Sequence, residues 1–417
     1  MVVSPNLLPC LAAAAMFAAV AVAQAPVPAT SAKDWPPTDP YTQGDRAAMK
    51  KAGYESFGPF PFGTDHTSRD VMVLLGTEPI LWIETEHFRI GCALSPLSLK
   101  NDEPWRDEWL SSLRQELRRL QARLPRVKTD VKELDPWLRA HLIAQRCEDL
   151  YADARKNFGL AEFTFPVAPD DPKDAEHFRG TGRHFGMREK FAILLLRRAS
   201  SHARYTRAYQ GSEMADPLRY HDAKFGCLYW GASEETANGL FAQDYPLHSH
   251  LAFNVANNLY TAYRGFSHEL PAWLATGLSH WHARHVTPRF PAYDRRDDDD
   301  KDPRSPFWDW DKRIAGLIKN QSFEPVAALL DRTTAGTFGV EQHMQSWSIA
   351  DFLLSEHKEK AMQFVHLLKE PMHARERAPT DLQLRIRQID ALQQCLGWTP
   401  AQLEEAWRAW ALDHRKK

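Results

Sequence analysis

Two neighbouring segments say most about the fold of this chain: residues 248–254, HSHLAFN, and residues 270–281, LPAWLATGLSHW. The pattern becomes helical after Tyr245, and the second segment follows the first after one helix and a turn. His250 and Asn254 are four residues apart, so they share one face of the first helix. We therefore expect two consecutive helices, with His250 and Asn254 directed toward Thr276 of the second.

The second segment is similar to the phrase LPxWLxEGLxxY/W of gluzincin-type zinc peptidases, in the peptidase MA-like superfamily. In that family an HExxH helix precedes the phrase, its two histidines and the phrase's glutamate hold zinc, and its own glutamate activates the zinc-bound water. Matched position by position, His250 replaces the first histidine, Leu251 the general base, Asn254 the second histidine and Thr276 the glutamate ligand. The resemblance implies a degenerate member that lacks most of this site.

The resemblance also implies a function. Amide and hydroxyl groups are poor zinc ligands, and leucine cannot act as a base. We therefore expect a secreted pseudopeptidase, a non-catalytic binding or interaction module with no catalytic residue and no cofactor. Its ligand would be an unknown protein, peptide or envelope component. One alternative is a metal-dependent hydrolase whose zinc is held at a rewired site drawn from His250, His280, His282 and His285. The other is a structural envelope protein without an open groove.

Polar side chains also follow the first of the two predicted helices. Asn254, Asn257, Asn258 and Thr261 form a stripe along it. Such a stripe suits either a hydrogen-bonded filling of the vacated metal cavity or the floor of a polar groove.

Composition places the chain among ordinary globular proteins. Of 417 residues, 43% are hydrophobic and 25% charged, which argues against long disorder, a coiled coil or a polytopic membrane protein. Lys and Arg number 52 against 54 Asp and Glu, and no stretch concentrates basic residues as phosphate binding would require. Nucleic acid is therefore not an expected partner. The 14 tryptophans are read as packing residues.

The N-terminus is typical of a secretory signal peptide. An apolar run without charge extends over residues 7–22, and a small-x-small pattern at residues 21–23 places the cleavage after Ala23. An uncleaved anchor is the alternative, since the run barely reaches spanning length. This predicts a protein that is secreted, periplasmic or attached to the cell envelope, with no membrane span after cleavage.

Four cysteines follow the predicted signal: Cys92, Cys147, Cys227 and Cys395. In an oxidising compartment they could form two bridges with three possible pairings, or remain buried free thiols. The sequence leaves the choice open, and it leaves the oligomeric state open as well.

Along the chain, the pattern predicts a predominantly helical α+β fold, with a small sheet and a helical C-terminal part. Residues 24–80 are rich in Pro and Gly and are read as a tether with surface loops, so that order begins near Leu81. A metallopeptidase-like domain would then fill residues 81–417. Its parts are 81–180 (an N-terminal strand and helices), 185–286 (strands and the motif helices), 287–306 (an acidic loop containing Asp297–Asp300) and 307–417 (the helical C-terminal part).

Several elements are expected within these parts. Strands are predicted within residues 81–90, 191–196 and 224–230, and a helix through residues 203–209. A helix begins at Trp105, and a second begins at Pro136 with Asp135 as its N-cap. A last helix begins at Pro400, where Thr399 and Gln402 have the spacing of a capping box. The apolar stripe of the first helix consists of Trp109, Leu113, Leu117, Leu120 and Leu124.

Overall fold

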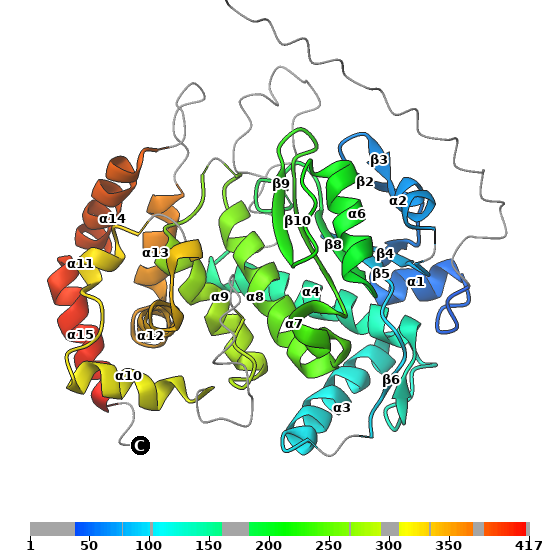
Figure 1. The fold of residues 1–417 in the computed structure, drawn as a ribbon, viewed down its shortest axis with the longest axis horizontal. Coiled ribbons are helices and arrows are strands. Elements are labelled where there is room, and N and C mark those ends of the chain that lie inside the picture. The colour runs from blue at the N-terminus through cyan, green and yellow to red at the C-terminus, as the bar shows by residue number, and fades with distance from the viewer. Residues whose placement is uncertain are drawn as a thin grey trace, which may run out of the picture. The chain divides into compact units, whose positions relative to one another are not determined.

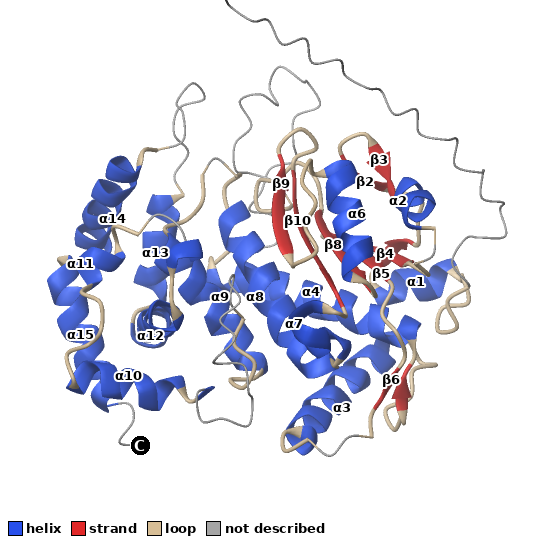
Figure 2. Cartoon of the chain, in the orientation of Figure 1, coloured by secondary structure: helices blue, strands red, loops and turns tan. Residues whose placement is uncertain are grey.

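A mixed β-sheet with helices on both faces forms the N-terminal two thirds of the described chain (Figures 1 and 2). The computed structural model describes residues 38–76, 78–100, 103–160, 183–266, 268–292, 308–332, 335–369 and 379–413. Within these ranges the main sheet has six strands, in the spatial order β1 (Tyr54–Ser56), β4 (Leu81–Thr85), β5 (Phe88–Cys92), β8 (Phe191–Leu196), β10 (Cys227–Ser233) and β9 (Leu218–Asp222). β5, β8 and β10 are parallel, and the remaining neighbours pair antiparallel.

The central strand β8 is buried on both faces, as its continuous apolar run predicts. Phe191, Ile193 and Leu195 belong to the larger hydrophobic cluster, whereas Ala192, Leu194 and Leu196 belong to a second cluster on the other face. The alternation follows from the two-residue period of a strand. β8 therefore joins two cores, one on each side of the sheet.

Different helices cover the two faces. α2 (Ser68–Leu75) and α6 (Ala199–Tyr209) pack over the second cluster. α4 (Pro136–Asn157) and α8 (Asp244–Ala262) pack on the opposite face, with α3 (Arg106–Arg123) against α4. Two small ladders lie beside the sheet: β2 (Pro61–Gly63) with β3 (His66–Thr67), and β6 (Leu97–Ser98) with β7 (Glu133–Leu134).

The capping predictions are confirmed. Asp135 caps α4 by accepting a hydrogen bond from the backbone of Leu138 at 3.0 Å, and Pro136 occupies the first helical position. At the last helix, α15 (Pro400–Asp413), Thr399 and Gln402 exchange side-chain to backbone hydrogen bonds. The predicted apolar stripe of α3 is buried in the larger cluster.

The C-terminal part is helical, as predicted. Its described elements are α10 (Trp310–Lys319), α11 (Val326–Leu329), the 3₁₀ turn Ala335–Thr337, α12 (Val340–Glu356), α13 (Lys358–Leu368), α14 (Asp381–Leu396) and α15, and the motif helix α9 (Ala272–Val286) precedes them. α9 packs against both α8 and α12, so it connects this part to the sheet-containing part. A short turn, α7 (Thr236–Gly239), continues into a 3₁₀ turn at Leu240–Ala242 before α8.

Regular structure begins before Leu81, earlier than the sequence predicts. α1 (Arg46–Ala52), β1, β2, β3 and α2 all lie within residues 24–80, and β1 is a strand of the main sheet. Asp45 caps α1, and Thr67 and Asp70 form a capping box for α2. The elements are too short for a period to be visible, which is why composition alone suggested loops.

Three further outcomes concern strands, cysteines and membrane spans. The strand expected at residues 224–230 begins at Cys227, and a strand that the sequence analysis does not predict, β9, precedes it. The four cysteines Cys92, Cys147, Cys227 and Cys395 are free thiols. No helix within the described ranges has the length and apolarity to cross a membrane. The predicted signal peptide and the run Asp297–Asp300 lie outside the described residues.

Candidate functional site

A buried ion-pair network fixes the N-terminus of α8, the helix that carries His250, Leu251 and Asn254. Asp244, the first residue of α8, accepts hydrogen bonds from the Arg146 guanidinium at 2.7 and 2.8 Å and from the Trp109 indole at 3.0 Å. Arg146 also binds Glu116 at 2.7 Å. Burial disfavours the Asp244 carboxylate, but the nearby Arg146 charge outweighs it and holds the pKa of Asp244 far below its usual range. The helix is therefore anchored where the motif begins.

Asn254 is part of a polar contact between α8 and the edge strand β9. Its side-chain nitrogen donates to the carbonyl of His250, one turn earlier, at 2.8 Å. Its side-chain oxygen accepts from the Arg219 guanidinium of β9 at 2.8 Å. The guanidinium also lies 5.8 Å from the centre of the Phe253 ring. The cationic Arg219 side chain thus lies directly beside Asn254, the position that matches the second zinc ligand.

The other matched positions differ in exposure. Leu251 is fully buried in the larger hydrophobic cluster. His250 is half-buried, with its ring centre 4.5 Å from that of Phe241. Thr276 is buried on α9, which packs directly on α8. Only His250, among these four residues, has both a metal-binding side chain and partial access to solvent.

α9 lies unusually close to α12 at Gly277, the glycine of the motif phrase. A Cβ placed on Gly277 would be 2.3 Å from the Ser346 carbonyl oxygen and 2.9 Å from Ala350 Cβ. Only glycine permits this approach. The resemblance therefore includes a residue whose role in this chain is helix packing.

His280, one turn after Thr276, is paired with a histidine from a distant segment. His280 Nε2 and His343 Nδ1 of α12 lie 3.0 Å apart, and both residues are buried. The His280 ring also packs against Phe253 and Trp310. Burial, reinforced by the proximity of His343, holds the pKa of His280 well below its usual range. His280 is therefore uncharged at physiological pH, and the tautomers of the two rings decide which nitrogen donates.

The other two histidines proposed for a rewired metal site, His282 and His285, bond other partners. His282 shares a hydrogen bond of 3.1 Å with the buried Tyr260 hydroxyl, and burial lowers the pKa of His282 to about 3. His285 is exposed, and its Nδ1 bonds the Trp281 carbonyl at 2.6 Å. In the ranges that the structure describes, no three His, Cys, Asp or Glu side chains gather closely enough to hold a metal ion.

Sequence reasoning did not find two residues of this region, Arg219 and His343. Arg219 belongs to β9, whose first four residues are all half-buried and show no alternation. His343 is 63 residues from His280, and nothing in the spacing links the two. Only the packing of β9 and α12 against the motif helices brings them together.

The comparisons with known proteins add no relative. No protein-family model matches this chain, and no curated protein or solved structure gives a significant match to it.

Proposed function

We propose that this chain is a secreted or envelope-located binding module, built on a peptidase-like scaffold that has lost its zinc chemistry. The proposal starts from the residues at the four motif positions, of which only His250 could bind zinc. The residues that surround these positions support it further.

The observation that carries the proposal is the hydrogen bond between Arg219 and Asn254. A guanidinium is permanently charged and has no lone pair to offer a metal. Placed at 2.8 Å from the Asn254 oxygen, it opposes a divalent cation at this position and already uses the amide oxygen that could have been a weak ligand. The residues present do not fit a zinc ion at the matched position.

The general base is missing as well. Leu251 stands at its position and is packed into the core, with no group that could take a proton from water. Hydrolysis through the matched site would therefore lack both the metal and the base.

For the ligand, we propose an extended polypeptide segment that lies along β9. β9 is the terminal strand of the sheet within the described ranges, so its outer edge is not paired there. Terminal strands can pair with an added strand. Arg219 of β9 lies at Asn254, and His221 of the same strand contacts Phe266, in the connection between α8 and α9. A peptide at this edge would therefore lie beside the motif helices.

The test uses a disordered polypeptide, reduced and carboxymethylated lactalbumin, labelled with fluorescein. We expect saturable binding by fluorescence anisotropy and no new fragments by mass spectrometry. Arg219→Gln should weaken binding, since it removes a charged group beside the edge strand. Arg118→Gln, at an exposed position on α3, is the matched control and should bind like the parent.

Each other outcome counts against the proposal. Fragments that disappear with a chelator would support the metal-dependent hydrolase instead. Absence of saturable binding, or equal binding by Arg219→Gln, would overturn the assignment of β9 as a polypeptide-binding edge.

A second experiment tests the matched positions themselves. The triple variant Asn254→His, Thr276→Glu, Arg219→Gln supplies the two missing ligands and removes the opposing cation, so it should bind zinc more tightly than the parent. Asn258→His replaces Asn254→His in the control, because Asn258 donates to the Tyr229 carbonyl of β10 and lies about 12 Å further along the helix axis than His250, too far to share a metal ion with it. Equal zinc affinity in a folded triple variant and its control would mean that the wrong residues were matched.

A further inference from the structure

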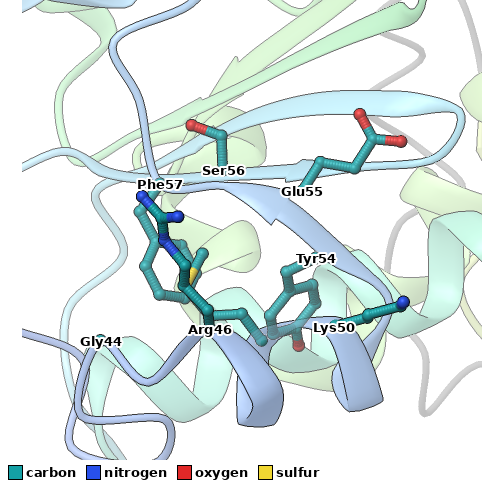
Figure 3. A pocket seen from close by; sticks show the side chains of 8 residues that line it. Gly44, Arg46, Lys50, Tyr54, Glu55, Ser56 and Phe57 are labelled. Atoms are coloured by element: carbon teal, nitrogen blue, oxygen red, sulfur yellow. The ribbon is translucent and has the colours of Figure 1, made fainter.

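A hollow of about 620 Å³ lies between α1 and β1. β1 and β9 are the two terminal strands of the described sheet, so this hollow is at the edge opposite the motif helices. Figure 3 shows α1 below the hollow and the β1 strand above it. Its lining includes Arg46, Met49 and Lys50 from α1, and Tyr54, Ser56 and Phe57 from β1 and the residue after it. The volume lies within the range of small-molecule sites, roughly 300–1,000 Å³.

Two cations of α1 border the hollow. Arg46 and Lys50 are four residues apart and share one helix face, with Met49 between them. Both are exposed, and within the described ranges no carboxylate forms an ion pair with either. In Figure 3 the Arg46 side chain extends toward Phe57, whereas Lys50 extends to the other side. These cations can therefore receive an anionic group from solvent.

The one acidic lining residue, Glu55, is already paired. Lys190 of the neighbouring part of the sheet donates to Glu55 at 2.6 Å and to the Thr85 carbonyl at 2.6 Å. Figure 3 shows the Glu55 carboxylate directed away from Arg46. Glu55 thus does not neutralise the cations of α1 directly.

The wall beside these cations consists of the aromatic residues Phe57 and Tyr54, which buried side chains hold in place. Phe57 packs edge-on against Trp137 of α4, with ring centres 5.4 Å apart, and is in contact with Tyr54. The Tyr54 hydroxyl bonds His141 Nδ1 at 2.7 Å, and His141 Nε2 bonds Asp39 at 3.1 Å. His141 and Asp39 are fully buried. This chain of hydrogen bonds and stacked rings fixes Tyr54, so the wall is formed before any ligand arrives.

We propose that the hollow between α1 and β1 binds a small organic anion, with its carboxylate at Arg46 and its apolar body on Phe57 and Met49, while Lys50 adds positive charge on the other side of the hollow. Arginine binds carboxylates through paired N–H donors, and an aromatic wall accepts an aromatic or aliphatic body. The Ser56 hydroxyl oxygen accepts from the Gly58 backbone at 2.8 Å, which leaves its O–H able to donate a further hydrogen bond to the anion. This site is independent of the proposed polypeptide-binding edge.

The test is ligand-observed NMR and calorimetry with 3-phenylpropionate on the full chain. We expect saturable binding that 3-phenylpropan-1-ol, its neutral analogue, does not reproduce. The double variant Arg46→Gln, Lys50→Gln should weaken binding at least tenfold, because it removes the charged donor to the carboxylate and the second positive charge of the hollow. Added salt should weaken binding in the parent for the same reason.

The matched control removes the same number of positive charges from another helix. Lys312→Gln with Lys319→Gln removes two exposed cations from α10, which lies far from α1 in Figure 1. This control should bind 3-phenylpropionate as the parent does. No saturable binding by the parent, equal binding of the alcohol, or an equal loss in both double variants would overturn the proposal. Phe57→Leu gives a further check, since loss of the ring should reduce affinity for the aromatic anion more than for hexanoate.

Discussion

Replacing Gly277 by alanine tests whether the motif phrase packs as described. The added Cβ would lie 2.3 Å from the Ser346 carbonyl oxygen, which is backbone and cannot rotate away. Ordinary contact requires α9 and α12 to separate by roughly 1 Å, and overpacking of this kind costs about 1–3 kcal/mol or more. Alanine also gains up to about 1 kcal/mol of helix propensity over glycine. The two terms together give a net loss of roughly 0–2 kcal/mol in the free energy of unfolding, and a larger loss if α9 and α12 cannot separate.

The assay is urea unfolding followed by far-UV circular dichroism. Gly316→Ala is the control, because Gly316 also lies inside a helix, α10, but a Cβ there would meet nothing within 4 Å. It should raise stability by up to about 1 kcal/mol. If Gly277→Ala is as stable as Gly316→Ala, the close packing of α9 on α12 is wrong, and the role assigned to the motif glycine fails with it.

Three further predictions concern buried charge and thiols. Burial lowers the pKa of Lys369 to about 7, whereas an unfolded lysine has a pKa of about 10.4. Between these pH values the unfolded chain holds more protons than the folded one, so the free energy of unfolding should rise with pH, by at most roughly 5 kcal/mol. Urea unfolding at a series of pH values should show this rise in the parent and not in Lys369→Met. Asp244→Ala leaves the buried Arg146 charge with one carboxylate fewer and should cost about 3–5 kcal/mol, whereas a loss under 1 kcal/mol would contradict the anchoring role. Cys395, half-exposed, should react with Ellman's reagent in the native protein, while the three buried cysteines of the described ranges react only after unfolding; reaction of all four at one rate would be inconsistent with their burial.

The helices that could be predicted are those with long periods and clear caps. α3 shows its apolar stripe over about four turns, and Asp135 and Pro136 mark the start of α4. The strand β8 is visible as a short apolar run. In each of these elements the local pattern and the final packing agree, so the sequence is sufficient.

The elements that were missed have no such pattern. β1 has three residues, and its place in the sheet depends on pairing with β4. β9 is half-buried along most of its length, since it is a terminal strand with no clean inner and outer face. Its pairing with β10, rather than its own sequence, makes it a strand.

In the candidate site, too, some contacts follow from the local sequence and others depend on tertiary packing. The helix period places His250 and Asn254 one turn apart, and the Asn254 amide indeed bonds the His250 carbonyl. The partner Arg219 comes from a strand 35 residues earlier, so its contact with Asn254 depends on tertiary packing. The sequence therefore predicted that His250 and Asn254 share one helix face, but not that Arg219 contacts Asn254.

The most direct test of the central claim is the zinc content of the purified protein. After dialysis at neutral pH, elemental analysis should find far less than one zinc per chain, because the matched positions offer one histidine and an opposing guanidinium. One tightly held zinc per chain, lost in His280→Ala but kept in Asn254→Ala, would contradict the account and show that the metal site was rebuilt around other histidines.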